Sequence, residues 1–373
     1  MMVLRQPMAA PPPVQMLNSS VDIPPYVVGA HRDPSYTRHV ALEFAMHKMI
    51  GSGTFGNVYV ARMGLASESV AIKRVKKEIH YRSRELDILR ILDHPNVIYM
   101  KYYFLTTNEM GEEFMHFVME YVPKSLYSVI LGCSRTHQNV PRFLCKVYAW
   151  QLLRALNYLH SQDICHRDVK SHNILIDPHT NNLKLADFGS AKKLHLNEPN
   201  VSYICSRYYR APELLLNFTH YTTAIDMWSF GICLIEMITG ETPFNGQCEA
   251  SQFMAIAQVL GTPPSRLLRE MNLSLDDCNL ILPGRPEKKL KEALPSSIPS
   301  NGFKLLKTVL TYDWTQRATA LELCTHDFFD EIKNERYAGN LPNGIFCWEN
   351  QEFDPKPELR NKIIPRYVRH GSR

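Results

Sequence analysis

Polar residues placed around two short apolar segments constrain this chain more than any other feature. Segments 174–176 and 183–186 are each the length of a strand, and residues typical of turns join them. Asp168 and Asn173 precede the first segment, and Asp187 follows the second. A hairpin of these segments brings its two outer ends together. We therefore expect the three polar side chains to meet at one edge.

The same stretch contains the residue types that transfer of a phosphoryl group demands. His166 and Arg167 stand directly before Asp168, and Lys170 lies between Asp168 and Asn173. The reaction needs two substrates held in line and neutralisation of the charge on the phosphate oxygens. An acid beside the acceptor, oxygen ligands for a metal and nearby bases can meet both needs.

Three motifs follow one another in this region. The chain carries His166-Arg167-Asp168 with Asn173 five positions later, then Asp187-Phe188-Gly189, and then Ala211-Pro212-Glu213. In this order they resemble the motif set of the protein kinases. Segment 198–213 is similar to that of the glycogen synthase kinase-3 branch of the CMGC group of serine/threonine kinases. The resemblance extends over about residues 44–331.

The resemblance implies an α+β, two-lobed protein kinase fold. We expect a small β-rich N-terminal lobe from about 44 to 119 and a larger, mainly α-helical C-terminal lobe from about 121 to 331, with ATP between them. Residues 1–43 are rich in proline and lack apolar periodicity, which predicts a mobile extension. Residues 332–373 end in basic residues and are expected to form a solvated, flexible tail, with a binding arm as the alternative.

A glycine-rich segment occurs at the start of the expected small lobe. Gly51, Gly53 and Gly56 form Gly-x-Gly-x-x-Gly, and a strand-like sequence follows instead of the helix that a dinucleotide site requires. Asn57 stands where a Walker A motif has lysine. The pattern predicts a hairpin whose amides cover phosphates, although an ordinary tight hairpin would have the same sequence.

A lysine and a glutamate in this region are expected to pair. Lys73 lies on the next expected strand, and Glu85 shares a helix face with Ile88, Leu89 and Leu92 within 78–92. A carboxylate on an apolar face is costly unless it is paired. Lys73 is the natural partner, and the pair would hold the lysine at the α- and β-phosphates; an exposed Glu85 is the alternative.

Two long helices are expected in the larger lobe. Segment 141–160 has one broad apolar face, and 222–239 is apolar almost all round with Gly240 just beyond it. In kinases the acid that matches Asp226 secures the backbone of the catalytic loop. Arg317 resembles the late arginine that pairs with Glu213.

The resemblance implies roles for individual site residues. Asp168 would accept the proton of the substrate hydroxyl, Lys170 and Lys73 would provide positive charge to the phosphates, with Glu85 as the partner of Lys73, and Asn173 and Asp187 would ligate Mg²⁺. The hinge, at Glu120 and Val122, would bind adenine through its backbone. The expected ATP-binding residues are Ile50, Gly51, Gly53, Phe55, Gly56, Val58, Ala71, Lys73, Met119, Glu120, Val122 and Leu175.

Substrate choice is also suggested by the resemblance. The family recognises serine or threonine with a priming phosphate four residues C-terminal, and its three basic residues match Arg84, Arg167 and Lys192. The alternative is that these bases only order the activation segment through its own phosphate. Tyr203 matches the activation-segment tyrosine that is phosphorylated, with a buried, unmodified tyrosine as the alternative.

Some positions depart from the family. Ser171 and His172 stand where the family has Pro and Gln, and Ser128 stands where it has Arg near the ribose. Segment 261–299 matches the family's insert in position and is expected to be irregular. Leu275 replaces a tyrosine of its scaffold-binding surface, so scaffold proteins are only a possible set of partners there.

Composition excludes several other classes of protein. The net charge of +5 comes from 42 basic and 37 acidic residues without a basic stripe, so no nucleic-acid partner is expected. The nine cysteines contain no Cys-x-x-Cys pair, which indicates reduced thiols and a cytoplasmic, and also nuclear, protein. The most apolar run, 230–238, is too short to span a membrane and contains Glu236.

The sequence therefore predicts an ATP- and Mg²⁺-dependent serine/threonine protein kinase that favours primed protein substrates. A pseudokinase scaffold is the rival of another class, and it would be favoured by loss of Lys73, Asp168 or Asp187, all of which are present. A Pro-directed kinase that needs no priming is the rival among enzymes.

Overall fold

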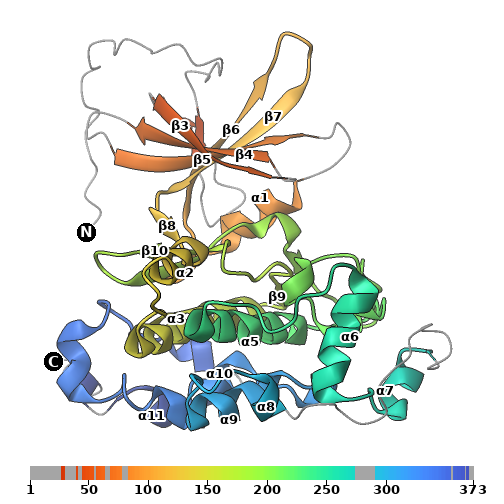
Figure 1. Cartoon of the computed structure of the whole chain (residues 1–373). Coiled ribbons are helices and arrows are strands. Elements are labelled where there is room, and N and C mark those ends of the chain that lie inside the picture. Colours follow the sequence, from red (N-terminus) through yellow and green to blue (C-terminus); the bar gives the residue numbers. More distant parts are fainter. Residues whose placement is uncertain are drawn as a thin grey trace. The chain divides into compact units, whose positions relative to one another are not determined.

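The computed structural model divides into two compact units. It describes residues 27–29, 39–40, 44–53, 56–63, 68–77, 83–273, 290–353, 356–365 and 367–368. One unit comprises Met1–Leu92 and Tyr99–Tyr121, and the other comprises Asp93–Ile98 and Val122–Arg373. Strands dominate the first and helices the second, which confirms the expected α+β class (Figure 1).

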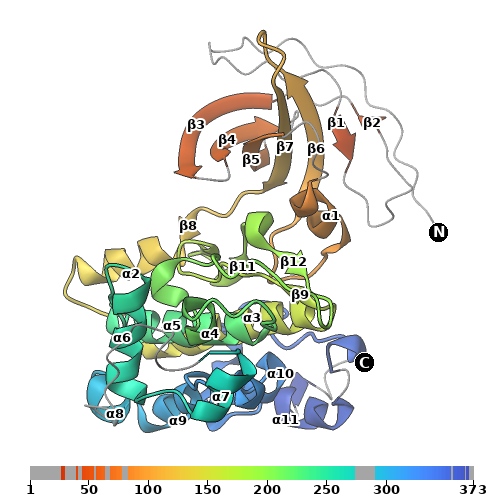
Figure 2. The same cartoon turned by 90° about the vertical axis from the view of Figure 1, so that its right-hand side faces the viewer.

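An antiparallel sheet forms the first unit. Within the described residues it has seven strands in the order β2-β1-β6-β7-β5-β4-β3. Their bounds are β1 Val27–Gly29, β2 His39–Val40, β3 Phe44–Gly53, β4 Gly56–Met63, β5 Glu68–Lys76, β6 Met100–Thr107 and β7 Glu113–Glu120. Figure 2 shows β1 and β2 at the edge of this sheet, beside β6.

The two edge strands correct the expectation of a wholly mobile N-terminal extension. β1 pairs with β6 through Val28↔Tyr103 and Gly29↔Tyr102, and β2 pairs with β1. Such short strands carry no periodic signal in the sequence, because their pairing depends on an available sheet edge. The rest of 1–43 lies outside the described residues.

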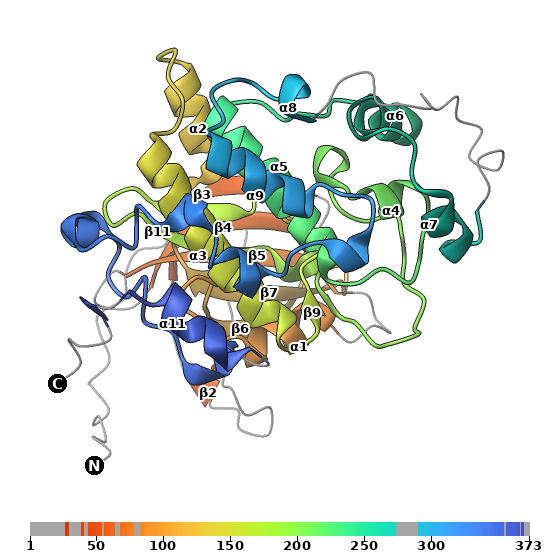
Figure 3. The same ribbon diagram turned by 90° about the horizontal axis from the view of Figure 1, so that it is seen from below.

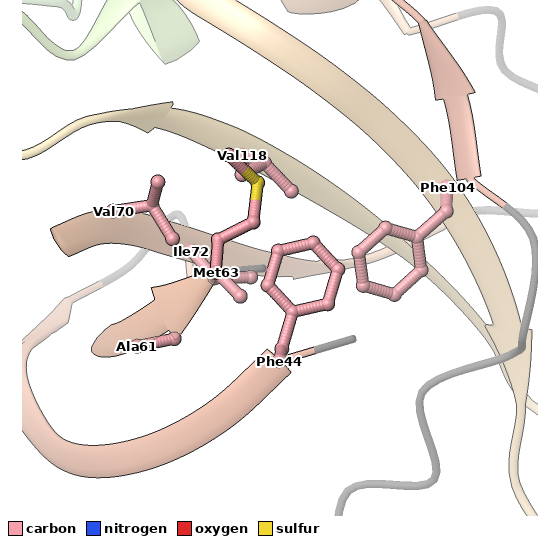
Figure 4. Close-up of a cluster of buried hydrophobic side chains, with 7 residues drawn as sticks. All are labelled: Phe44, Ala61, Met63, Val70, Ile72, Phe104 and Val118. Carbon is pink, nitrogen blue, oxygen red and sulfur yellow. The ribbon is translucent and has the colours of Figure 1, made fainter. Parts of the chain in front are cut away.

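One face of the sheet is closed by a hydrophobic cluster. Paired residues on adjacent strands point to the same face, so Ile72 and its partner Val118 lie together. The rings of Phe44 and Phe104 stack at 6.1 Å across the same cluster (Figure 4). The cluster consists of Phe44, Ala61, Met63, Val70, Ile72, Phe104 and Val118. The opposite face carries the alternate residues, Lys73 among them.

Helix α1, Arg84–Ile91, completes the first unit. Ser83 is its N-cap, and its side chain accepts a hydrogen bond from the amide of Leu86. Ile88 and Leu89 are buried on the same face as Glu85, as the apolar spacing predicts. The expected helix began at 78, but residues 78–82 lie outside the described part.

The second unit is mainly helical, and the bounds of its elements are as follows. The α-helices are α2 Leu126–Ser134, α3 Arg142–His160, α4 Pro212–Leu215, α5 Ala224–Thr239, α6 Glu249–Leu260, α7 Ser265–Glu270, α8 Leu290–Ala293, α9 Ser300–Val309, α10 Ala320–Leu323 and α11 Arg360–Ile363. The 3₁₀ helices are η1 Phe188–Ser190, η2 Arg207–Tyr209, η3 Trp314–Gln316, η4 Asp327–Phe329, η5 Glu335–Asn340, η6 Asn350–Phe353 and η7 Pro357–Leu359. The short strands are β8 Lys124–Ser125, β9 Ile164–Cys165, β10 Ile174–Asp177, β11 Asn182–Leu185 and β12 Lys192–Lys193.

The predicted helices and hairpin of this unit are confirmed. α3 and α5 match the segments expected from periodicity, and Gly240 ends α5 with φ 84°. β10 and β11 form the expected hairpin, with Ile174 paired to Leu185. The insert is less irregular than expected, because α7 and α8 lie within 261–299, while 274–289 lies outside the described residues.

The C-terminal extension overturns the expectation of a solvated tail. Ile345, Phe346, Trp348, Phe353 and Ile363 are all at most 7% exposed. The rings of Phe346 and Trp348 pack against Trp150 of α3, whose Nε1 donates to the carbonyl of Ile345, and Phe353 stacks on Trp348. Figure 3 shows α11 and this segment in the helical unit. Within the described residues the extension up to about 364 is part of the core of the unit.

No helix in the described part of the chain combines the length and the apolar character that crossing a membrane requires.

Candidate functional site

A glycine hairpin joins β3 to β4. Gly53 and Gly56 are paired at its end, while Thr54 and Phe55 at the tip lie outside the described residues. Gly56 has φ +120°, and a Cβ there would lie 2.1 Å from the carbonyl oxygen of Arg74, so only glycine fits. A Cβ at Gly53 meets nothing within 4 Å. The backbone of this hairpin can therefore be approached closely by a ligand, as binding through amides requires.

Lys73 and Glu85 form the predicted ion pair. The Nζ of Lys73 lies 2.6 Å from Oε1 of Glu85, and the two side chains are 6% and 10% exposed. The partner explains why α1 tolerates a carboxylate on its apolar face. Lys73 is held away from the hydrophobic cluster because it lies on the opposite face of β5.

Three other expected nucleotide-binding residues, Val58, Ala71 and Met119, lie on the same face of the sheet as Lys73. Val58 pairs with Lys73, and Ala71 pairs with Met119 of β7. The amide of Glu120 donates to the carbonyl of Tyr99 at 3.1 Å, which fixes the end of β7. The side chain of Ile50 is 46% exposed, whereas that of Met119 is buried at 9%.

The remaining two expected nucleotide-binding residues belong to the helical unit. Val122 lies two residues beyond the end of β7, and Leu175 lies on β10, where it pairs with Ser125 of β8.

The expected catalytic loop, residues 166–173, is fixed at its beginning by α5. The carboxylate of Asp226 accepts from the amides of His166 at 2.8 Å and Arg167 at 2.9 Å. His160 lies 3.0 Å from the same carboxylate. Burial alone raises the pKa of Asp226, but the hydrogen bonds from His160 and His166 and their charges outweigh it, so the pKa is lowered. The buried acid therefore acts as the expected support of the loop.

Asp168 is oriented by four donors. Its Oδ1 accepts from both the amide and the hydroxyl of Ser206, each at 3.0 Å. Its Oδ2 lies 2.7 Å from Nζ of Lys170 and accepts from the side-chain Nδ2 of Asn173 at 3.0 Å. Lys170 also donates to the Ser206 hydroxyl at 2.9 Å. Asp168, 6% exposed, therefore has one fixed orientation.

Ser206 is a site residue that the sequence did not reveal. One serine among many has no distinctive pattern, and only its position five residues before the Ala211-Pro212-Glu213 motif could have drawn attention to it. The structure places its hydroxyl between Asp168 and Lys170.

Asn173 and Asp187 lie at the expected edge of the β10–β11 hairpin. The amide of Ala186 donates to the carbonyl of Asn173, so the two chain segments are adjacent there. The side-chain amide of Asn173 donates to Asp168, which leaves its oxygen as the atom that can coordinate a cation. Asp187 has φ 63°, a conformation that is uncommon outside glycine and that occurs at functional sites.

These two oxygen-bearing side chains fit a hard cation such as Mg²⁺. Within the described ranges no group of three or more His, Cys, Asp or Glu side chains could hold a metal by itself. The donor set suits an ion that takes its other ligands from phosphate and water.

The residues expected to bind a priming phosphate lie in both units. Arg84 begins α1 and is exposed. In the helical unit Arg167 donates to the carbonyl of Ser190 and to Tyr221, while Lys192 contacts Glu198 at 2.8 Å and Asn200 at 2.6 Å. β12 pairs with β9, which brings Lys192 beside Cys165 and so beside the start of the loop 166–173.

Tyr203 is 72% exposed, so the alternative of a buried tyrosine is wrong. The guanidinium of Arg210 lies 4.8 Å from the centre of its ring. Arg207 donates to the carbonyls of Gly246 and Gln247.

The pairing of Arg317 with Glu213 is confirmed. The two nitrogens of the guanidinium contact the two carboxylate oxygens at 2.6 and 2.7 Å, and both side chains are at most 1% exposed. The pair joins the residue that follows η3 to α4 and so fixes the segment that ends in the Ala211-Pro212-Glu213 motif.

One family model, described as the protein kinase domain, matches residues 44–329. This match covers most of the chain, including the glycine hairpin, the Lys73–Glu85 pair and the loop around Asp168. The chain therefore belongs to the protein kinase family.

Proposed function

We propose that this protein kinase transfers the γ-phosphoryl group of Mg²⁺-bound ATP to serine or threonine hydroxyls, as a divergent member of the glycogen synthase kinase-3 branch. The observation that carries the proposal is the environment of Asp168, whose carboxylate is held by Ser206, Lys170 and Asn173. A fixed carboxylate beside a lysine is what alignment of an acceptor hydroxyl requires.

In the proposed reaction the acceptor oxygen forms a bond to the γ-phosphorus, and the bond from phosphorus to the bridging oxygen of ADP breaks. Asp168 orients the hydroxyl and accepts its proton. Lys170 and Lys73 offset negative charge on phosphate oxygens, and Glu85 holds Lys73 in place. Asn173 and Asp187 would hold a Mg²⁺ ion, which would supply further positive charge to the phosphates.

Replacement of Asp168 by Asn tests this proposal. The variant keeps the size of the side chain but removes the proton acceptor, so kcat for peptide phosphorylation should fall about 10²–10⁴-fold. Asp163→Asn is a matched control, because Asp163 is exposed and has φ 59°, which asparagine adopts readily. Activity of the Asp168 variant equal to that of the control would refute the assignment, and an inactive wild-type protein that still binds nucleotide would favour the pseudokinase scaffold.

We further propose that Arg84, Arg167 and Lys192 bind a priming phosphate on the substrate. Charge-assisted hydrogen bonds to a phosphate contribute about 1.5–3 kcal/mol each, so loss of one should lower kcat/KM about tenfold or more. The present partners of Lys192 are an exposed carboxylate, Glu198, and an amide, Asn200, both of which a phosphate can displace.

Comparison of one peptide with and without the priming phosphate tests the pocket. Lys192→Ala should slow phosphorylation of the primed peptide alone, whereas Lys193→Ala, at the exposed neighbouring position, should not. Equal rates on both peptides with the wild-type protein would instead support a Pro-directed kinase that needs no priming.

A further inference from the structure

A second, buried connection lies beside the contact of Asp168 with Ser206. The hydroxyl of Ser171 donates to Oε1 of Glu236 at 2.9 Å, and the hydroxyl of Tyr209 donates to Oε2 at 2.6 Å. The two hydroxyl oxygens lie 3.0 Å apart. Each hydroxyl has a single hydrogen and donates it to the carboxylate of Glu236. The two hydroxyl groups are therefore held side by side by this one carboxylate. Ser171 is 0% exposed, and Tyr209 and Glu236 are each 5% exposed.

The residues of this connection follow those of the Asp168–Ser206 contact at the same spacing in both chain segments. Ser171 lies three residues after Asp168, and Tyr209 lies three residues after Ser206. Residues 207–209 form the 3₁₀ helix η2, in which positions three apart eclipse one another, and the amide of Tyr209 donates to the carbonyl of Ser206. Any movement of Tyr209 is therefore transmitted to Ser206.

Helix α5 holds the catalytic loop at two places as a result. Asp226 binds the amides of His166 and Arg167 at the beginning of the loop, and Glu236 binds Ser171 near its end. Burial raises the pKa of Glu236, and the hydrogen bonds from Tyr209 and Ser171 partly offset this effect. These two donors are thus the groups that make a buried carboxylate tolerable at this position.

We propose that Ser171 is a positioning residue that couples the catalytic loop to segment 206–209 through Glu236 and Tyr209, and so fixes the Ser206 hydroxyl between Asp168 and Lys170. Proline, which occupies this position in the family that the chain resembles, has no hydroxyl and cannot make this bond. The coupling is therefore a property of this chain. Its kinetic consequence depends on the proposed phosphotransfer, whereas its structural consequence does not.

Hydrogen–deuterium exchange on the full chain tests the structural part. Ser171→Ala removes only the hydroxyl, and exchange of the amides in 206–209 should become about tenfold faster, as expected when a hydrogen bond to a charged group is lost. Ser171→Pro should give the same change. Ser161→Ala is the matched control, because its exposed hydroxyl bonds only to the Tyr158 carbonyl among the described contacts. Exchange in 206–209 within twofold of wild type would overturn the proposal.

Kinetics tests the positioning role separately. We expect kcat for peptide phosphorylation to fall about tenfold in Ser171→Ala with KM for ATP unchanged, because the acceptor side of the site is the part that moves. Tyr209→Phe should have the same effect, and the double variant should be no worse than either single variant, because both disrupt one connection. Additive losses, or an unchanged kcat in an active protein, would refute the inference.

A failure of the proposed phosphotransfer can be distinguished from a failure of the proposed coupling. A wild-type protein without phosphotransfer contradicts the proposed function and leaves exchange in 206–209 to decide the coupling. If Ser171→Ala lost its fold by circular dichroism, Tyr209→Phe would supply the same two measurements.

Discussion

The buried carboxylate of Glu352 should be one of the largest single contributors to the stability of the helical unit. Its Oε1 lies 3.0 Å from Nε of Arg154 and 3.3 Å from Nε2 of His94, and the Arg154 and Glu352 side chains are 3% and 7% exposed. Arg154 also donates to the carbonyls of Gly344 and Cys347. The carboxylate therefore joins α3, the segment 93–98 and the C-terminal extension.

Replacement of Glu352 by Ala leaves the guanidinium of Arg154 buried without its counter-charge. Breaking a buried pair in this way costs about 3–5 kcal/mol. For a unit of this size each kcal/mol lowers Tm by about 2–4 °C, so we expect a fall on the order of 10 °C. Differential scanning calorimetry of the full chain measures it. Glu358→Ala in the same extension is the control, because Glu358 is exposed and its loss should change stability by less than about 0.5 kcal/mol.

The difference between wild type and variant should depend on pH in a defined direction. Burial raises the pKa of Glu352, but hydrogen bonds from His94 and Arg154 and the charge of Arg154 outweigh it, so the pKa lies below its usual 4.5. A depressed carboxylate pKa contributes stability above the usual value that is lost as the pH falls through the folded one. The difference in stability between the two proteins should therefore begin to shrink as the pH falls below about 4.5. Equal Tm values for Glu352→Ala and Glu358→Ala at pH 7 would refute the reasoning.

Three further predictions concern other parts of the molecule. Arg317→Ala should lower the free energy of unfolding in urea by about 3–5 kcal/mol, because Glu213 is left buried and without its partner. Lys76→Ala removes one member of an exposed pair and should lower it by less than about 1 kcal/mol. Equal losses in the two variants would contradict this prediction. Burial lowers the pKa of His116 to about 4, and the charge of a nearby arginine contributes to this shift. The free energy of unfolding should therefore fall as the pH drops from 6.5 to 4, by at most about 1.4 kcal/mol for each pH unit. In His116→Gln, the free energy of unfolding measured by thermal melts should depend less on pH between 6.5 and 4. An unchanged dependence on pH would refute this prediction. Lys73→Met should lower kcat/KM for ATP about 100-fold in a peptide assay without unfolding the chain, and retained activity would remove Lys73 from the site.

Elements with a strong local pattern were predictable from the sequence. Helix α5 is apolar all round and ends at Gly240, and the β10–β11 hairpin has turn residues between two apolar runs, so both formed where expected. The Lys73–Glu85 pair followed from the cost of a carboxylate on an apolar face. These predictions succeeded because each rests on local spacing or on one large energetic penalty.

Features that depend on a distant partner surface were not predictable. Phe346, Trp348 and Phe353 follow neither a helical nor a strand period. Their burial is explained only by the contacts of Trp150 with Phe346 and Trp348 and by the stacking of Phe353 on Trp348. Strand β1 is similarly defined by the edge that β6 offers. Polar contacts such as those of Ser206 or Ser171 depend on which side chains the fold brings together, and the residue type alone does not indicate them.

The packing of the C-terminal extension also bears on how a working fragment of this protein should be cut. A fragment that stopped at residue 329, where the family match ends, would lack the rings of Phe346 and Trp348 that cover Trp150 and the carboxylate of Glu352 that pairs with Arg154. Newly bared aromatic surface of this kind promotes aggregation. The smallest fragment suited to recombinant expression therefore extends through Ile364.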